Sequence, residues 1–184
     1  MQAKTKGRSL PGCASQDHPS RSGVQQVKTL VLALGNDILG DDGAGPAAAR
    51  MLRSTLPDDV DVVESSEAGL ALLEHIEGYD RVLLLDAVVT GRCAPGTVIE
   101  LSPDDLEKIV APSPHYAGIP EVLEMGRRLG LKMPCEMRIL ALEVERPDTV
   151  CEGLTSSVEA GLPSFVARAA QVVHLWRRSI PTTR

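Results

Sequence analysis

The sequence predicts an α/β protein in which helices cover both faces of a mostly parallel, five-stranded twisted sheet, a three-layer sandwich with one antiparallel edge strand. Three observations lead to this prediction. Short aliphatic runs alternate with helical segments, and several runs are apolar throughout, which is typical of strands buried on both faces. The chain has 184 residues, the length of one domain. With 43% hydrophobic and 24% charged residues, it is expected to be globular and soluble.

The first half of the chain supplies three predicted strands and two predicted helices. Val27–Leu34 is aliphatic almost throughout and ends at Gly35, which indicates a buried strand. Residues 44–55 have a helical pattern, and Pro46 is tolerated because it falls in the first turn. The elements that follow are a strand at Val60–Val63, a helix at Gly69–Ile76 and the most hydrophobic strand, Arg81–Val89.

The second half begins with a turn, Ala94-Pro95-Gly96, that leads into a strand at Thr97–Leu101. Because parallel neighbours need a dozen or more connecting residues, this strand is predicted to be antiparallel and to lie at the sheet edge. Ser102 is a good N-cap for a short helical turn over 102–105. The remaining predicted elements are a helix at Ile119–Leu131, a strand at Met137–Val144 and a long helix at Thr155–Trp176.

Residues 1–27 differ in composition from the rest of the chain. Four basic residues stand against Asp17, and the segment has no apolar periodicity. We therefore expect a disordered basic leader, or a start codon placed too early, ahead of a single domain over residues 28–178 and a tail over 179–184. The segment around Cys13 does not predict export, because no apolar stretch precedes it.

Composition excludes several classes of function. A net charge of −6 and an aromatic content of 2% argue against a nucleic-acid partner. The apolar runs are too short for membrane insertion. The cysteines show no CxxC pair, so we expect a reducing, cytoplasmic location and no zinc or disulfide framework; they are Cys13, Cys93, Cys135 and Cys151.

Ligands of open α/β sheets bind beyond the carboxyl ends of the strands, which here selects the loops after the first and third strands. The first loop, residues 35–45, contains Asp41 and Asp42; one can cap the following helix, which leaves the other carboxylate spare. Asp86 follows four aliphatic residues, where a carboxylate is costly unless it is hydrogen-bonded or faces a cation. Together with His115, these carboxylates suit a divalent first-row metal or acid–base catalysis.

Five short segments carry a resemblance to a known family. Taken together they resemble the hydrogenase maturation endopeptidases over about residues 28–176. The segments are Leu34-Gly35-Asn36, Asp41-Asp42-Gly43-Ala44-Gly45, Leu85-Asp86-Ala87, Ala94-Pro95-Gly96-Thr97 and Ser113-Pro114-His115.

The resemblance implies an endopeptidase that removes the C-terminal extension of a nickel-iron hydrogenase large-subunit precursor after nickel insertion. It implies that Asp42, Asp86 and His115 form the catalytic and metal-binding site. Nickel is then carried by the substrate and bound only weakly by the free enzyme, with no organic cofactor, and we expect a monomer. The turn Glu64–Gly69 departs from the family pattern at Ser66 and Glu67, which leaves the choice of substrate open.

Two other functions remain open at this point. A receiver-like phosphoacceptor domain also has paired aspartates after its first strand and an aspartate such as Asp86, but it needs a lysine at the end of its last strand, where this chain has Glu143. A non-catalytic metal-binding chaperone is the other alternative. The sequence has no HExxH motif and no serine or cysteine protease signature. Water activation by a carboxylate (an aspartic-type mechanism) or by the metal is therefore undecided.

Overall fold

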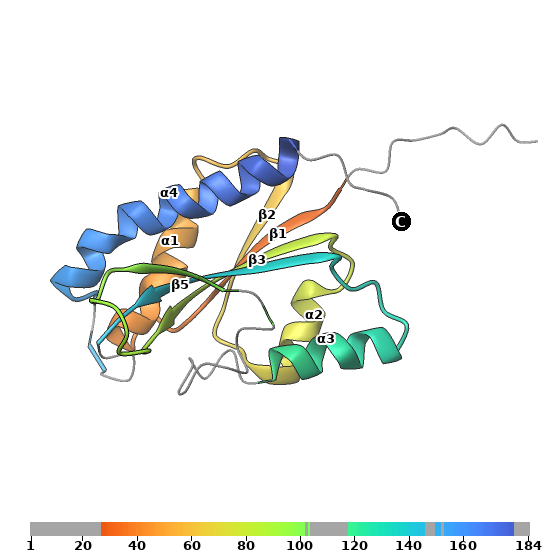
Figure 1. Cartoon of the computed structure of the whole chain (residues 1–184), viewed down its shortest axis with the longest axis horizontal. Helices are drawn as coiled ribbons and strands as arrows, with labels where there is room; N and C mark the ends of the chain where they lie inside the picture. The colour runs from red at the N-terminus through yellow and green to blue at the C-terminus, as the bar shows by residue number, and fades with distance from the viewer. Residues whose placement is uncertain (1–26, 102, 104–117, 146–149, 152, 179–184) are drawn as a thin grey trace, which may run out of the picture.

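A computed structural model describes residues 27–101, 103, 118–145, 150–151 and 153–178 (Figure 1). The strands are β1 (Thr29–Leu34), β2 (Val60–Ser65), β3 (Arg81–Val88), β4 (Val98–Leu101) and β5 (Glu136–Glu143). The helices are α1 (Ala44–Leu52), α2 (Leu72–Ile76), α3 (Ile119–Arg128) and α4 (Ser156–Arg178), with 3-10 turns η1 (Gly40–Gly43) and η2 (Gly69–Ala71). None of the helices in these ranges is long and apolar enough to cross a membrane. Most of the predicted leader, the tail and most of the turn at 102–105 lie outside the described residues.

The strands form one five-stranded sheet in the order β2-β1-β3-β5-β4. Strands β2, β1, β3 and β5 run parallel to one another, whereas β4 pairs antiparallel with β5 at the edge of the sheet. The predicted fold class is therefore confirmed, including the antiparallel edge strand. Its direction follows from its connection, because the short loop between β3 and β4 leaves no room for a crossover helix.

The helices cover both faces of the sheet, with α1 and α4 on one side and α2 and α3 on the other (Figure 1). Alternate residues of β3 enter the two cores: Leu83 and Leu85 join the α1 and α4 side, and Val82 and Leu84 join the α2 and α3 side. Because side chains alternate along a strand, Asp86 points to the same face as Val82 and Leu84. The three-layer arrangement thus directs the Asp86 carboxylate toward the side of the sheet that α2 and α3 cover.

Helix α1 is shorter than predicted, because it ends at Leu52 and not at residue 55. The Ser54 hydroxyl donates a hydrogen bond to the carbonyl of Met51, and the Thr55 hydroxyl donates one to the carbonyl of Leu52, each at 3.0 Å. Short hydroxyl side chains compete in this way with the helical backbone pattern. The helical composition therefore continues past the point at which the local hydrogen bonds end the helix.

Helix α3 also ends early, at Arg128 where the sequence predicted Leu131. Gly130 takes a φ of 72°, and its N–H donates to the carbonyl of Arg127 while the N–H of Leu131 donates to that of Gly126. These two bonds are the Schellman motif, which satisfies the last carbonyls of a helix and favours glycine at the left-handed position. Gly130 is thus the stop signal of this helix.

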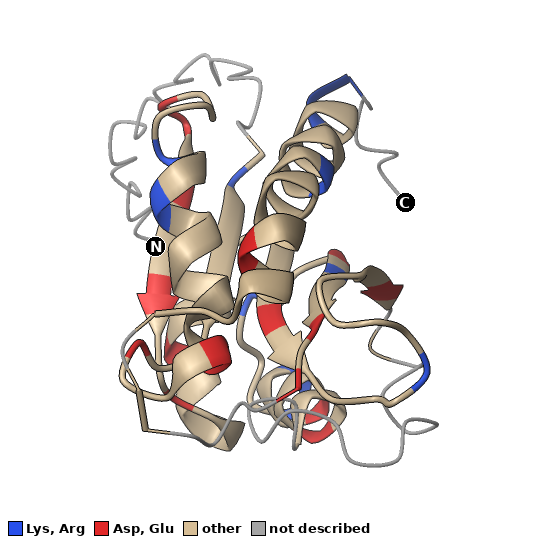
Figure 2. Ribbon diagram, turned by 90° about the vertical axis from the view of Figure 1, so that its left-hand side faces the viewer, with Lys and Arg blue, Asp and Glu red and all other residues tan. Residues whose placement is uncertain are grey.

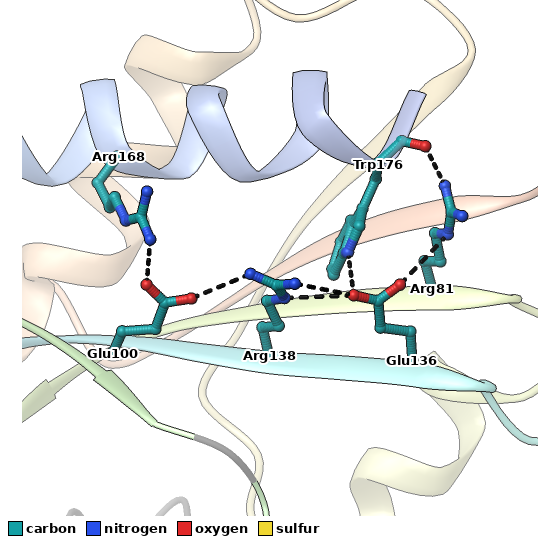
Figure 3. Close-up of polar contacts among 6 residues, drawn as sticks. All are labelled: Arg81, Glu100, Glu136, Arg138, Arg168 and Trp176. Carbon is teal, nitrogen blue, oxygen red and sulfur yellow. Dashed lines mark hydrogen bonds and ion pairs between the residues drawn. The ribbon is translucent and has the colours of Figure 1, made fainter. Parts of the chain in front are cut away.

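A chain of charged side chains joins α4 to the edge of the sheet (Figure 3). Glu100 of β4 accepts hydrogen bonds from Arg168 of α4 and from Arg138 of β5. Arg138 also contacts Glu136, which accepts a hydrogen bond from the indole of Trp176. The hydrogen bond from Arg168 lowers the pKa of Glu100 below its ordinary value, against an opposing effect of burial. The carboxylate therefore stabilises the fold above its unfolded pKa, and this contribution is lost as pH falls through the lowered value.

The first turn of α1 lies against the ends of two strands at Gly45. A Cβ atom on Gly45 would lie 2.3 Å from the carbonyl oxygen of Leu34 and 2.9 Å from that of Leu85. Both contacts are with backbone atoms, which cannot move aside without shifting the strands. A side chain at this position would therefore push α1 away from β1 and β3.

We expect Gly45→Ala to lower the free energy of unfolding by about 2 kcal/mol, the usual cost of overpacking a close contact. Gly126→Ala in α3 is the matched control, because the added Cβ there meets the end of the flexible Met133 side chain. Its loss should be smaller, since alanine also favours the helix. Urea denaturation of both variants measures the difference, and equal losses would contradict the role given to Gly45.

Candidate active site

The first loop folds back over the carboxyl edge of the sheet, so that η1 contacts the end of β3. Gly35 makes this possible: its φ is 136°, and a Cβ there would lie 2.0 Å from the carbonyl oxygen of Asp42. Its N–H donates to the carbonyl of Ser65 at the end of β2, with a length of 3.1 Å. The loop is thereby closed against the sheet, and glycine is the residue that allows it.

Asp42 lies in η1 and is buried. One of its carboxylate oxygens, Oδ2, accepts a hydrogen bond of 2.6 Å from the backbone N–H of Asn36. The backbone N–H of Asp42 donates to the carbonyl of Leu39 at 3.2 Å. Residues of the loop therefore bond to both the carboxylate and the backbone of Asp42.

Asp86 occupies the sixth position of β3 and is completely buried. Its Oδ1 atom accepts a hydrogen bond of 2.7 Å from the N–H of Ala87. It is paired in register with Ala141 of β5 and lies on β3, the central strand of the sheet. Two of the three predicted site residues, Asp42 and Asp86, thus occupy neighbouring elements at one edge, whereas His115 lies outside the described residues.

The expectation that one aspartate of the first loop caps α1 is wrong. The N-cap of α1 is Gly43, and no side chain bonds to this helix end. Asp41 instead accepts hydrogen bonds from the N–H of Thr155 at 2.7 Å and from its hydroxyl at 3.1 Å. Asp41 therefore accepts hydrogen bonds at the start of α4. Its partner Thr155 is 114 residues away in the chain, so no local sequence pattern could reveal this contact.

Glu143, at the end of β5, is a buried carboxylate whose role the sequence analysis missed. It accepts three hydrogen bonds from the loop that follows β3: from the N–H and hydroxyl of Thr90 at 2.8 and 2.6 Å, and from the N–H of Gly91 at 2.7 Å. The signal that could have found it is the same one that singled out Asp86, a carboxylate directly after an aliphatic run. Glu143 holds the loop beyond Asp86 in place.

Acidic residues are frequent in the loops at this end of the molecule, toward the bottom of Figure 2, whereas the basic last turn of α4 is at the top. Some of these acids are neutralised by ion pairs. Arg50 contacts Asp37 and also Glu64, the latter at 2.9 Å, and its hydrogen bond to Asp37 raises the pKa of the guanidinium. The described part of the chain holds no group of three His, Cys, Asp or Glu side chains arranged to bind a metal ion.

Buried carboxylates at the carboxyl edge of an α/β sheet suit a hydrolase that uses acid–base or metal-assisted chemistry. Comparison with known proteins identifies the family of hydrolases: the sequence model of the family "Hydrogenase maturation protease" matches residues 47–172 of this chain. This chain belongs to the hydrogenase maturation protease family. The matched range contains Asp86 and His115, and Asp42 lies just before it.

Relatives and solved structures agree with this assignment. The hydrogenase 2 maturation protease of Escherichia coli K12 is 31% identical over 138 residues, which cover 73% of this chain and 83% of the relative. The hydrogenase maturating endopeptidase HybD from E. coli superposes with a TM-score of 0.69 at 27% identity, covering 80% of this chain and 93% of that one. The maturation protease HybD from Thermococcus kodakarensis has a TM-score of 0.63 at 26% identity, covering 79% and 99%.

The chain is therefore a hydrogenase maturation endopeptidase, and the resemblance seen in the sequence is confirmed. Members of the family process the hydrogenase large-subunit precursor. The receiver-like alternative is wrong. The chain belongs to another family, and the end of β5, where a receiver needs a lysine, holds Glu143.

We expect Asp41→Ala to lower the free energy of unfolding by about 1–3 kcal/mol, because it leaves the N–H at the start of α4 without its acceptor. Thr155→Val removes only the hydroxyl bond and should cost less. Thr155→Ser keeps the hydroxyl and serves as the control, with stability close to that of the original protein. Urea unfolding measures all three. Undiminished stability of Asp41→Ala would show that the link between η1 and α4 contributes nothing.

Proposed function

We propose that this enzyme removes the C-terminal extension of a nickel-iron hydrogenase large-subunit precursor only after nickel has been inserted, by recognising the nickel in its substrate. The observation that carries the proposal is the placement of two buried carboxylates, Asp42 and Asp86, on adjoining elements at one sheet edge. The family to which the chain belongs supplies the substrate class. We further propose that the enzyme works in the cytoplasm as a monomer.

Asp42, Asp86 and His115 are the residues proposed to contact the nickel that the precursor holds. Oxygen and nitrogen ligands of this kind suit divalent first-row metals. The sequence position of His115 supports its inclusion, because it precedes Gly118 by three residues. Gly118 lies beside Gly69, the residue that opens η2 beyond β2, at the carboxyl edge of the sheet.

Recognition of nickel gives the protease a way to respond to the state of its substrate. A metal bound by the precursor's own side chains places the segment to be cut next to Asp42 and Asp86, so that cleavage depends on metal occupancy. Hydrolysis adds water to the peptide carbonyl and returns a proton to the leaving nitrogen. A carboxylate at the site is able to accept the proton from water and to pass it on.

The decisive experiment compares purified precursor with and without nickel. We expect cleavage of the nickel-loaded precursor and none of the nickel-free form, followed as a shift in the mass of the large subunit. Equal cleavage of both forms would refute recognition of the metal while leaving the protease activity in place.

The exchanges Asp42→Asn, Asp86→Asn and His115→Ala should each abolish processing of the nickel-loaded precursor, because each removes a proposed contact to the metal or a proton acceptor. Asp37→Asn is the matched control: it lies in the same loop, but its side chain is half exposed and bound to Arg50. It should process the precursor at close to the original rate. Circular dichroism checks that each inactive variant is folded, and full activity of Asp86→Asn would exclude the proposed site.

The isolated protein should bind nickel, cadmium or zinc weakly, since a permanent structural site normally has four ligands and this one has three. Binding should fade below about pH 6, because a histidine must be neutral to bind metal and an unperturbed imidazole titrates near pH 6.5. Calorimetric titration with nickel at two pH values measures both effects. Nanomolar binding that persists in His115→Ala would point to a different, permanent site.

A further inference from the structure

The pairing of β3 with its neighbours changes at Asp86. Strand β3 lies between β1 and β5, but its pairing with β1 ends at the pair of Ala33 and Leu85 (Figure 1). Its pairing with β5 continues beyond that point, to the pair of Val88 and Glu143. Among the described residues, β5 is therefore the strand that holds the backbone of β3 at Asp86 and at the two residues after it. The position of Asp86 thus depends on how firmly the end of β5 holds the end of β3.

Glu143, the last residue of β5, faces the same side of the sheet as Asp86. Ile139 and Ala141 of β5 join the core on the α2 and α3 side, whereas Leu142 joins the core on the other side. Because side chains alternate along a strand, the Glu143 side chain points to the α2 and α3 side. Since Asp86 pairs with Ala141, Glu143 lies one strand away from Asp86 and two residues nearer to the carboxyl edge.

Glu143 also bonds to both ends of the loop that joins β3 to β4. At the start of this loop, its carboxylate accepts hydrogen bonds from the N–H groups of Thr90 and Gly91 and from the Thr90 hydroxyl, at 2.6 to 2.8 Å. At the end of the loop, its carbonyl accepts a bond of 2.8 Å from the N–H of Gly96, and its N–H donates to the carbonyl of Thr97 at 2.9 Å. We call the three bonds to the carboxylate the Glu143 clasp.

The clasp suits a residue that holds other groups in position. Both carboxylate oxygens are used: Oε1 accepts the two N–H groups, and Oε2 accepts the Thr90 hydroxyl. The hydroxyl oxygen accepts a bond of 3.1 Å from the N–H of Arg92, which fixes its direction. Glu143 is 2% exposed, so moving its carboxylate would leave buried polar groups without partners, at a cost in free energy.

We propose that Glu143 is a positioning residue for the cleavage reaction, because its clasp on the loop holds the end of β3, and thereby Asp86, in place. This inference rests on the proposed function, since it takes Asp86 as a working group of the protease. A neighbouring backbone bond of 2.9 Å, from the N–H of Val144 to the carbonyl of Val88, holds the strand just before the clasp. Without the clasp, the end of β3 would open more easily toward Asp86, because the ends of elements with few contacts open first.

The test compares Glu143→Ala with Glu143→Gln, using nickel-loaded precursor at saturating concentration. Alanine removes all three bonds of the clasp, whereas glutamine keeps an oxygen for the two N–H groups and an amide that donates to the Thr90 hydroxyl. We expect Glu143→Ala to lower kcat by at least about tenfold, since a small displacement of a positioned group can cost about a hundredfold. Glu143→Gln should stay within about threefold of the original kcat, because it keeps the shape and the bonds of the clasp.

Glu100→Ala is the matched control, because Glu100 is also a carboxylate that joins a strand to other elements, through Arg138 and Arg168. It should lower the stability and leave kcat unchanged. Circular dichroism checks the folding of each variant. Thr90→Val, which removes only the hydroxyl bond, replaces Glu143→Ala if alanine prevents folding. It should lower kcat less than alanine does, and Thr90→Ser should keep the original kcat.

Hydrogen exchange gives a second measurement that needs no substrate. The N–H of Ala87 donates to the Asp86 carboxylate, so its exchange rate reports on the position of that side chain. Glu143→Ala should speed exchange at Ala87 and Thr90 and leave the rate at Leu32, in the middle of β1, unchanged. Such a local effect distinguishes positioning from a general loss of stability.

Three results would overturn the positioning role: an unchanged kcat in Glu143→Ala, an equal fall in Glu143→Gln or Glu100→Ala, or faster exchange spread evenly over the sheet. Failure of the proposed function is recognised separately, because the original protein then leaves the nickel-loaded precursor uncut. In that case the exchange rate at Ala87 alone decides whether Glu143 positions Asp86.

Discussion

The close approach between the first loop and the ends of β1 and β3 is the constraint on which the rest of the site depends. A Cβ atom on Gly35 would clash with the carbonyl oxygen of Asp42, and one on Gly45 would clash with the carbonyl oxygens of Leu34 and Leu85, so only glycine fits at these positions. Because glycine at these two positions lets the first loop and α1 approach the strands closely, Asp42 is buried and η1 contacts β3. The glycines thus determine where the carboxylate lies.

Within the part of the chain that the structure describes, four buried carboxylates lie in the elements at this edge of the sheet: Asp41, Asp42, Asp86 and Glu143. Asp41 and Glu143 bond to other segments, Asp41 to the start of α4 and Glu143 to the loop after β3. Asp42 and Asp86 bond to backbone groups within their own loop and strand. The first two hold the surrounding loops, and the other two are the proposed working groups. In a buried setting the attraction of such carboxylates for a cation exceeds that in water, because the effective dielectric constant is lower.

A second set of stabilising contacts lies on the β5 and β4 side of the sheet. The charged chain through Glu100, Arg138 and Glu136 joins β4 and β5 to α4, and the Trp176 side chain packs over Arg138 (Figure 3). These contacts involve Arg168 and Trp176 in the later turns of α4, whereas Asp41 bonds to Thr155 at its start. Helix α4, which has 23 residues, therefore connects this charged network to the loops around the site.

The order of the elements, the parallel sheet, the antiparallel edge strand and the loops that carry Asp42 and Asp86 could all be predicted from the amino-acid sequence. Each of these follows from local hydrophobic periodicity or connection length, which the chain carries within a few residues. The bonds of Asp41 to Thr155 and of Glu143 to Thr90, and the bridge between Leu39 and Cys151, depend instead on how the whole chain folds. These contacts join segments about 50 to 114 residues apart, and one sequence contains no local signal for them. These contacts depend on the order of the strands in the sheet, because that order brings loops that are distant in sequence to the same edge.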